Sequence, residues 1–600
     1  MKVRWTGATR PGNWWVARTA VALIALQLAL RAVLAFGGYF YWDDLILIAR
    51  AGTHSLLSPS FLFDDHDGHV MPAAFLISGG ITKLAPFSWI GPAISLVVLQ
   101  LVASLALLRA LWVILGWRPV LLVPLTFALF STMGLPSFAW WAAALNALPM
   151  IAALAWVCGD AILLVRTGNQ RYAVSTLAVY FVGLLFFEKA AVIPFVAFAV
   201  AALLAHVTGD PAPLKTVWRR GIRLWTVALV LTVAWVAVYL AVVDQRRWTM
   251  DPSMTLDLLV RSVTHGIVPT LVGGPWDWER WAPSSPWALP QWPVMVLGWL
   301  ALLAIIAVSR LRKERIGPVW WAAAGYVAAC QVPIYLMRSS RFTAIELAQT
   351  LRYLPDLVVV LALLAAIAFC APNRSTSGWM DASRARTGVI IACAVLFVGS
   401  SLYSGATFLT SWRDNPTRSY LNNARAGFAA ANASSTAPLL DQEVDPHILQ
   451  RFSWPDNLAS HIFALVQDRP EFSTSTTDLR VLDKAGNLVP ATATWVRAMI
   501  PGPKPQCGYL VQPDLPVRIP LSGPMLPTEW TAELNYLANS EGSITMALSD
   551  GDETKVPVHP GLNRVFVRLS GAGNAINVRA NTAALSVCLA AGPVGYVAPP

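Results

Sequence analysis

The feature that constrains this chain most is a series of about eleven apolar runs, most of which reach the roughly 20 residues that a helix needs to cross a bilayer. They lie at residues 15–38, 88–115, 119–136, 138–165, 171–187, 189–206, 223–243, 291–309, 318–337, 353–371 and 387–409. A spanning segment must satisfy its backbone hydrogen bonds internally, so these runs predict a polytopic α-helical membrane protein. A further apolar stretch at 71–86 is short and is expected to lie at the interface or to re-enter the bilayer.

Charge indicates how these spans are oriented. The net charge is +11, yet only 13% of the residues are charged, and many basic residues lie in short connections between apolar runs. These are Arg118, Arg166, Arg171, Lys215, Arg219, Arg220, Arg223, Arg310, Arg312, Lys313, Arg315, Arg374, Arg384 and Arg386. By the positive-inside rule, residues 1–14 form a cytoplasmic tail before a signal anchor, and an odd number of spans places the C-terminal region outside the plasma membrane. Topology accounts for the basic balance, and no nucleic-acid partner is expected.

The composition changes from about Thr410, where long apolar runs stop and Asn, Ser, Thr, Asp and Pro become frequent. We therefore predict a membrane domain at 15–410, a mixed linker at 411–475 and an outward-facing domain at 476–600. Alternating runs in the last domain predict a mainly-β fold of the sandwich or jelly-roll kind. The expected elements are a helix over Ser419–Ala431, a hairpin over Leu479–Val489, and strands over Ser543–Leu548, Lys555–Val558, Asn563–Leu569, Ala575–Val578 and Ala584–Leu589.

Two of the six cysteines, Cys507 and Cys588, lie in this polar C-terminal region. An isolated cysteine pair suggests a disulfide and hence an oxidising compartment. This inference agrees with the outward orientation derived from the basic residues.

Two adjacent carboxylates, in Tyr41-Trp42-Asp43-Asp44, follow directly after the first apolar run and open the predicted outer loop at 40–87. A carboxylate at a low-dielectric boundary can act as a general base that takes a proton from an attacking hydroxyl group. Asp43 and Asp44 are therefore candidate catalytic residues. The alternative is that they cap a juxtamembrane helix at its positive N-terminal end.

A second polar cluster in the same loop runs from Asp64 to His69. His54, His66 and His69 of this loop, together with Asp64, Asp65 or Asp67, could ligate a divalent cation, and this is one interpretation of the cluster. An ordinary solvated turn is the other. No zinc-type His and Cys spacing occurs, and a divalent cation is the only cofactor that the sequence suggests.

Charged residues recur at two further outward positions. Glu188-Lys189 separates two apolar runs, where ionisable residues usually face a cavity; the alternative is an ion pair within the turn. Arg338, Arg341 and Arg352 lie on the side that the positive-inside rule disfavours. Because an arginine fork binds phosphate oxygens, these arginines predict a phosphate site, the alternative being a basic loop that touches anionic lipid headgroups.

The outward loop at 244–290 is rich in tryptophan, proline and glycine, as in Gly273-Gly274-Pro275-Trp276-Asp277-Trp278. Trp276 is a candidate for stacking on a sugar ring. The alternative is that these tryptophans form an aromatic belt at the membrane interface.

Taken in order, these motifs resemble those of the GT-C superfamily of polyprenyl-phosphate-sugar glycosyltransferases, and most closely its protein O-mannosyltransferase-like branch. The likeness covers residues 15–410. Tyr41-Trp42-Asp43-Asp44 is similar to the acidic motif of the first external loop, and His69-Val70-Met71-Pro72 to the His-x-x-Pro that follows it. The other similar segments are Trp140-Trp141 to Leu148 (a Trp-rich span), Phe187-Glu188-Lys189-Ala190 with Pro194 (a Lys-Glu turn, here with the charged pair reversed) and Arg352-Tyr353-Leu354-Pro355 (a shortened Arg-Tyr-Leu-x-x-Pro).

The resemblance implies an inverting transferase that moves a sugar from a polyprenyl-phosphate donor to a cell-envelope glycan, lipid or protein acceptor at the outer face. It implies Asp43 as the base, with Asp44 as the alternate. The implied donor-phosphate residues are Arg352, Arg341, Arg338 and Lys189, and the implied substrate-binding residues are Glu188, His69, His66, Tyr353 and Trp276. The C-terminal domain resembles carbohydrate-binding jelly rolls and is expected to bind a glycan or to act as a structural lid.

The basic residues are mostly arginine, and Ala, Val, Leu and Pro abound, which suggests a GC-rich genome such as that of an actinobacterium. There the resemblance implies decaprenyl-phosphate mannose or arabinose as the donor. Two rival classes stay open, a lipid or glycan transporter and a non-catalytic membrane scaffold. Paired broken spans in matching halves, the mark of many transporters, are not evident.

Overall fold

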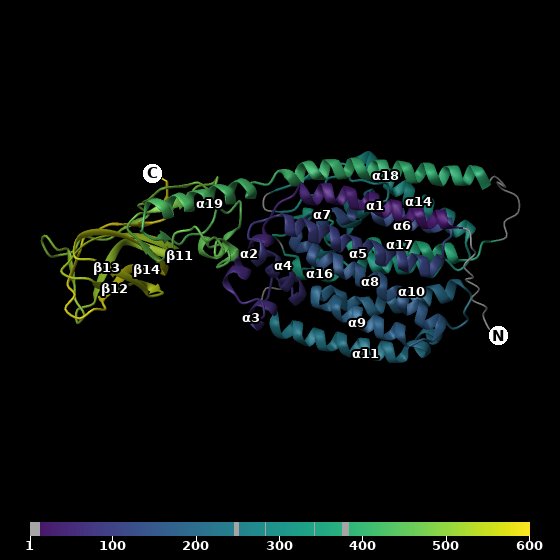
Figure 1. Cartoon of the computed structure of the whole chain (residues 1–600), viewed down its shortest axis with the longest axis horizontal. Coiled ribbons are helices and arrows are strands. Elements are labelled where there is room, and N and C mark those ends of the chain that lie inside the picture. The colour runs from purple at the N-terminus through teal and green to yellow at the C-terminus, as the bar shows by residue number, and fades with distance from the viewer. Residues whose placement is uncertain (1–12, 245–250, 282–283, 341, 375–382, 600) are drawn as a thin grey trace. The chain divides into compact units, whose positions relative to one another are not determined.

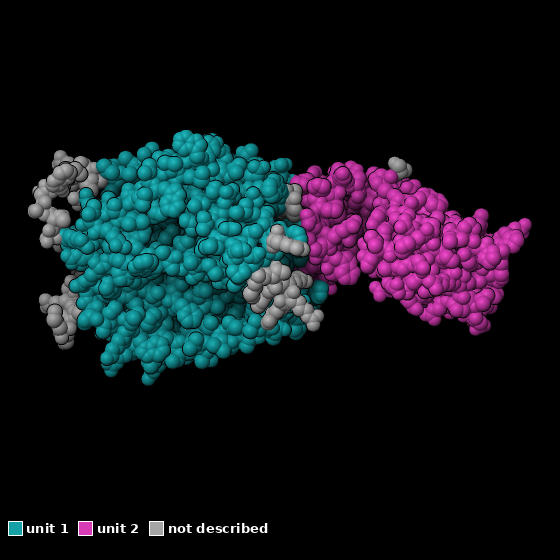
Figure 2. Space-filling model, turned by 180° about the vertical axis from the view of Figure 1, so that it is seen from behind, with its two compact units in different colours: residues 1–47, 54–415 teal, residues 48–53, 416–600 magenta. Residues whose placement is uncertain are grey.

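The computed structural model describes residues 13–244, 251–281, 284–340, 342–374 and 383–599. The chain divides into two compact units, which are coloured separately in Figure 2. Unit 1 comprises residues 1–47 and 54–415, and unit 2 comprises residues 48–53 and 416–600. Unit 1 is helical and unit 2 is rich in β-strands, as the composition predicted.

Unit 1 is a bundle of apolar helices that run alongside one another (Figure 1). Its long helices are α1 (Trp14–Phe36), α5 (Ile90–Leu115), α8 (Trp141–Thr167), η3 with α10 (Glu188–Val207), α11 (Pro213–Val242), α14 (Trp292–Arg312), α15 with α16 (Gly317–Arg338) and α18 (Ser383–Arg413). A bent pair consists of η1 with α6 (Pro119–Phe130) and η2 with α7 (Thr132–Ala139), and two shorter apolar helices are α9 (Arg171–Phe186) and α17 (Pro355–Cys370). In the described part of the chain, eight helices are long and apolar enough to cross a membrane, or nine if the bent pair is one span. Each predicted apolar run coincides with one of these elements, so the prediction of a polytopic helical protein is confirmed.

Helix α8 lies at the centre of this bundle. In its most apolar window 78% of the residues are buried, whereas in that of α14 only 11% are. It packs against α5, α9 and α10. Gly159 of α8 lies close to Ala110 of α5, and small residues of this kind allow membrane helices to approach closely.

Short elements connect the helices of unit 1. They are α2 (Asp43–Thr53), α3 (Pro59–Leu62), α4 (Pro72–Leu84), α12 (Pro252–Arg261), η5 (Ser262–Ile267), α13 (Val268–Thr270), β1 (Trp278–Glu279), β2 (Trp287–Ala288) and η6 (Ile345–Gln349). The apolar stretch that the sequence marked as short forms α4, which has 13 residues. The last residues of α2, 48–53, are grouped with unit 2.

Unit 2 begins with α19 (Thr417–Ser434), continues through η7 (Arg451–Ser453) and α20 (Ala459–Ile462), and ends in a sheet. Nine strands of its described residues form one sheet, whose main path is β10-β15-β11-β14-β12-β13. These strands are β10 (Tyr509–Val511), β11 (Val517–Ala538), β12 (Gly542–Gly551), β13 (Thr554–Val558), β14 (Gly561–Ala580), β15 (Val587–Leu589), β16 (Pro593–Gly595), β5 (Ser475–Thr476) and β9 (Arg497–Ala498). The shorter pairs are β3 (Leu439–Leu440) with β4 (Phe472–Ser473), β6 (Arg480–Leu482) with β7 (Leu488–Pro490), and β8 (Thr492–Ala493) with β17 (Val597–Ala598). A disulfide joins Cys507 to Cys588.

The longest strands differ from the expected pattern. The sequence predicted separate strands over 563–569 and 575–578, but β14 runs through both without a turn. Gly571 and Gly573 have φ values of 125° and 118°, which glycine alone adopts readily, so the chain stays in the sheet while the pairing shifts register. The hairpin predicted over 479–489 is confirmed, since β6 pairs antiparallel with β7.

Candidate active site

Asp43 and Asp44 are adjacent in sequence but have different surroundings. Asp44 is fully buried, and its carboxyl accepts hydrogen bonds from the backbone amides of Tyr41 (2.9 Å) and Ala142 (2.8 Å). Burial raises the pKa of Asp44 well above its ordinary value, and these two hydrogen bonds act against the rise. Trp42, just before the pair, has a φ of 46°, a strained value of the kind that clusters at functional sites. Asp44 therefore anchors the starts of α2 and α8, whereas Asp43 stays partly accessible to a ligand.

The pKa of Asp43 is raised to about 6, mainly by burial. The positive charge of Arg352 opposes this rise most strongly, followed by His69 and Arg338. Asp67 adds a negative charge that raises the pKa further. A carboxyl group with a pKa close to neutral accepts and releases protons readily near neutral pH, as a general base requires.

A tight turn holds Asp67 and His69. The backbones of His66 and His69 exchange two hydrogen bonds, of 3.1 and 3.0 Å, around Asp67 and Gly68. Both turn residues have positive φ, 51° and 86°, as a type I′ turn requires, and Asp-Gly is the usual sequence for it. The hydroxyl of Tyr239 in α11 donates to the Gly68 carbonyl at 3.0 Å, which ties the turn to the bundle.

His69 is paired with Glu188. Nδ1 of His69 lies 2.8 Å from Oε1 of Glu188. Burial lowers the pKa of His69, but the charge and hydrogen bond of Glu188 outweigh it, so the pKa is raised above its ordinary value. The other oxygen of Glu188, Oε2, is buried and has no hydrogen-bond partner. The alternative of an ion pair between Glu188 and Lys189 is wrong, because their side chains have different partners.

Lys189 forms an ion pair with Asp356, which lies 167 residues further along the chain. Its Nζ lies 2.8 Å from Oδ1 of Asp356 and donates to the Tyr353 carbonyl at 2.9 Å. The Tyr326 hydroxyl donates to Oδ2 of Asp356 at 2.7 Å, and the Asp356 side chain is only 1% exposed. The sequence analysis assigned Lys189 to the donor phosphate. In the structure its ammonium group instead links η3 to the segment that contains Tyr353 and Asp356.

Two arginines surround Asp43 with positive charge. The guanidinium of Arg352 lies over the rings of Trp140 (5.0 Å) and Tyr353 (4.9 Å) and donates to the Tyr353 hydroxyl at 2.8 Å. Arg338 donates to Oδ2 of Asp67 at 3.0 Å. Stacking on aromatic faces holds a guanidinium in place and leaves N–H groups at its edge for a ligand.

The proposed metal ligands do not converge. His66 is buried, and its ring packs edge-on against Phe75 at 6.0 Å. Asp65 accepts hydrogen bonds from two backbone amides, and Asp64 is half-buried. Over the described residues, no group of three or more His, Cys, Asp or Glu side chains is arranged to hold a metal ion. Metal dependence stays a prediction.

Trp276 lies against α18. Its backbone amide donates to the Ser404 hydroxyl and its indole N–H to the Ser400 hydroxyl, each at 2.7 Å. Its ring is 6.4 Å from that of Tyr403. These contacts fasten the tryptophan-rich loop to the last helix of unit 1. Arg341 lies outside the described residues.

Of the residues predicted from sequence, the structure gathers Asp43, His69, Glu188, Arg338, Arg352 and Tyr353 in one connected group. We call these residues, together with Asp67, the Asp43 cluster. Sequence reasoning missed Asp356 as the partner of Lys189 and Trp140 as a support for Arg352. Asp356 was visible as a lone acid at the start of an apolar run, where an ionisable residue usually has a purpose.

Comparisons with known proteins give little further information. No model of a known protein family matches the sequence, and no curated protein matches it. Two solved structures of ArnT from Cupriavidus metallidurans show a distant likeness. The structure bound to undecaprenyl phosphate is 16% identical, with a TM-score of 0.36, over 76% of this chain and 90% of that chain. The apo structure is 15% identical, with a TM-score of 0.37, over 73% and 84%.

Proposed function

We propose that this protein is a membrane glycosyltransferase that moves a sugar from a polyprenyl-phosphate donor to an acceptor hydroxyl group, with inversion at the anomeric carbon. One observation carries the proposal. Asp43, a half-buried residue whose carboxyl pKa is raised to about 6, lies among the charges of Arg352, Arg338 and His69. A carboxylate base suits a hydroxyl acceptor, and arginines suit a departing phosphate.

The reaction needs one base and one site for negative charge. The Asp43 carboxylate takes the proton of the acceptor hydroxyl, whose oxygen bonds to the anomeric carbon from the side opposite the phosphate. The bond from that carbon to the phosphate oxygen breaks, and its electron pair stays on the phosphate. The carrier phosphate thereby gains negative charge, which the guanidinium groups of Arg352 and Arg338 stabilise where it develops.

The remaining residues of the Asp43 cluster position these groups. Trp140 and Tyr353 hold Arg352, and Asp67 holds Arg338. Glu188 keeps His69 positively charged over a wider pH range, which supports the ionised form of Asp43. Lys189 and Asp356 secure the segment that carries Arg352 and Tyr353.

The finer assignment follows from the sequence. We expect the reaction at the outer face of the plasma membrane, on a cell-envelope glycan, lipid or protein, in a member of the O-mannosyltransferase-like branch of the GT-C superfamily. The expected donor is decaprenyl-phosphate mannose or arabinose in an actinobacterium. The β-rich region of unit 2 is proposed to bind the glycan acceptor.

A transfer assay on the full chain tests the proposal. Protein in phosphatidylcholine nanodiscs is incubated with radiolabelled decaprenyl-phosphate mannose or arabinose and a membrane extract as acceptor. We expect wild type to transfer label from one donor, and Asp43→Asn to lower the rate about 10²–10⁴-fold through loss of the base. Asp257→Asn, which changes an exposed acid on α12, is the matched control and should keep the wild-type rate. Equal rates for wild type and Asp43→Asn, or no transfer from either donor, would overturn the proposal.

A further inference from the structure

Arg31 is a buried cation without a counter-charge. It lies in α1, within a candidate membrane span, and is 7% exposed. Among the described residues its guanidinium makes no hydrogen bond or ion pair, and Nη1 is buried without a partner. It lies over the face of the Phe138 ring, at 4.8 Å from the ring centroid. Arginine keeps its proton in proteins, so Arg31 carries a full positive charge inside the bundle.

Two other cations of unit 1, both largely enclosed, are paired with carboxylates. Arg109 forms an ion pair with Asp160, whose side chain is fully buried. Lys189 forms one with Asp356. A charge in a membrane is retained at considerable cost and usually faces a partner or a cavity with a purpose. Arg31 lacks the partner but has the cavity.

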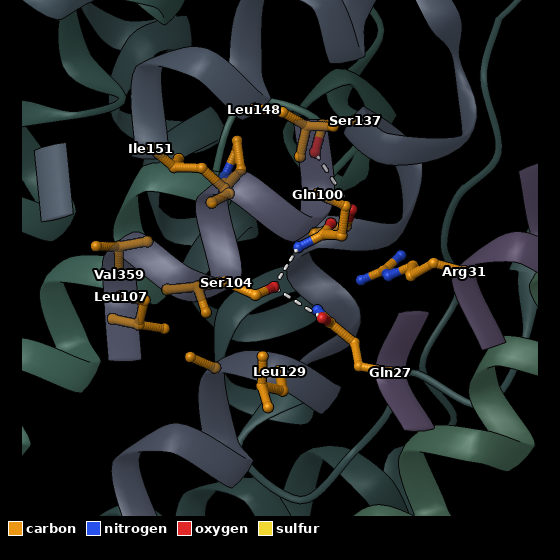
Figure 3. A pocket seen from close by; sticks show the side chains of 15 residues that line it. Gln27, Arg31, Gln100, Ser104, Leu107, Leu129, Ser137, Leu148, Ile151 and Val359 are labelled. Atoms are coloured by element: carbon orange, nitrogen blue, oxygen red, sulfur yellow. Dashed lines mark hydrogen bonds between the residues drawn. The ribbon is translucent and has the colours of Figure 1, made fainter. Parts of the chain in front are cut away.

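The cavity beside Arg31 is polar on the side that the guanidinium faces. Gln100 donates to the Ser104 hydroxyl at 3.2 Å, and that hydroxyl donates to Oε1 of Gln27 at 2.8 Å. Figure 3 shows the Arg31 guanidinium pointing toward this chain of hydrogen bonds, and Ser137 also lines the cavity. Gln27 lies four residues before Arg31 and so shares its face of α1.

The same cavity is apolar on its other sides. Leu107, Leu129, Leu148, Ile151, Val358 and Val359 line it. Its volume is about 40 Å³, which is more space than a single water needs. The space therefore fits a group of a few heavy atoms, the size of a phosphate.

From this arrangement we infer that Arg31 forms a binding site for a phosphate-class anion within the membrane unit. The guanidinium supplies a fork of donors that matches phosphate oxygens, and the amides of Gln27 and Gln100 supply further polar atoms. The anion provides the charge that Arg31 lacks, either as free phosphate or as the headgroup of a lipid whose chain meets the aliphatic lining.

This site differs from the arginines of the Asp43 cluster but lies near them in the chain. Phe138 contacts Arg31, and two residues later Trp140 contacts Arg352. Pro355, three residues after Arg352, also lines the Arg31 cavity. The inference does not rest on transferase activity, and it is tested by binding alone.

The test uses the full chain and two phosphate sources. In the first arm, thermal unfolding in detergent is followed as inorganic phosphate rises, with ionic strength held constant by sodium gluconate. In the second, the protein is placed in phosphatidylcholine nanodiscs with or without phosphatidic acid. We expect at least one source to raise the Tm by about 2 °C or more in wild type.

Three variants test whether the rise in Tm depends on Arg31. Arg31→Gln should lose the phosphate-dependent rise and, without phosphate, should unfold at or above the wild-type Tm because an unpaired buried charge is gone. Arg31→Lys should keep part of the rise. Arg18→Gln, which changes an exposed arginine of the same helix, should keep all of it.

The two arms distinguish the sources, since a rise with inorganic phosphate indicates a free anion and a rise confined to phosphatidic acid indicates a lipid headgroup. If neither source stabilises wild type, or if Arg31→Gln responds as wild type does, the site does not exist.

Discussion

The ion pairs of the two units differ in how they meet solvent. In unit 1 some are enclosed, as in Lys189 with Asp356, whose side chains are 14% and 1% exposed. In unit 2 several lie at the surface, as in Arg579 with Glu553, at 56% and 66%. Exposed pairs contribute little to stability because water screens them, whereas an enclosed pair becomes costly when one partner is removed. The enclosed ion pairs of unit 1 therefore mark places where the fold depends on a charge being partnered.

The largest effect is expected from Asp356→Ala. The change leaves the Lys189 ammonium enclosed and unpaired, so we expect a loss of about 3–5 kcal/mol in the free energy of unfolding. Thermal and denaturant unfolding in detergent measure this loss.

The double variant Lys189→Met with Asp356→Ala should recover part of the stability, since no unpaired charge remains. An Asp356→Ala protein as stable as wild type would show that the ion pair is not what holds η3 to α17.

A smaller effect is expected within unit 2, where some ion pairs are enclosed as well. Arg568 is 15% exposed and contacts Glu529 (2.7 Å) and Asp441 (3.3 Å). Arg568→Ala should cost about 1.5–3 kcal/mol, the usual range for hydrogen bonds to charged groups. Arg579→Ala, the exposed counterpart, should cost about 0–1 kcal/mol. Equal losses in denaturant unfolding would contradict the link drawn here between enclosure and stability.

The smallest expected effect is the change in kcat/KM per pH unit. Because the pKa of Asp43 is raised to about 6, the base is protonated below that pH, and kcat/KM should fall about tenfold per pH unit there. Arg352 opposes the rise in pKa, so Arg352→Gln should move the limb of the pH profile to higher pH. Transfer rates measured between pH 4.5 and 8 (about the range of the titration) test both points. A profile that is flat through pH 6 would exclude Asp43 as the base.

Stability should depend on the same ionisation with the opposite sign. A carboxyl group whose folded-state pKa is raised stabilises the fold while protonated, and this contribution is lost as pH rises through about 6. Asp43→Asn should therefore be more stable than wild type at pH 7–8, a range above that pKa. Burial raises the pKa of Asp44 as well, but its carboxyl differs in accepting hydrogen bonds from the backbone amides of Tyr41 and Ala142, which hold the starts of α2 and α8.

Much of the fold was predictable from local sequence. Apolar runs long enough to span predict helices because an isolated backbone in lipid has few other ways to satisfy its hydrogen bonds. Each predicted run coincides with a helical element, and the change of composition near Thr410 precedes the start of unit 2 at residue 416. The strand prediction failed at Gly571 and Gly573, where glycine served a register shift instead of a turn.

The sequence by itself determined that the chain spans a membrane, because the length of an apolar run is a local property. It also determined the candidates Asp43, His69, Glu188, Arg338 and Arg352, because a charged residue next to an apolar run can be recognised from its neighbours in sequence. The tertiary structure decided how these charges are partnered. It paired Lys189 with Asp356 and His69 with Glu188, and it placed the Asp44 carboxyl on backbone amides. It also placed Arg31 beside a cavity with one polar side. These partners lie on segments that are far apart in the sequence. Packing between those segments brings them together, and the spacing of residues along the chain does not predict which ones will meet.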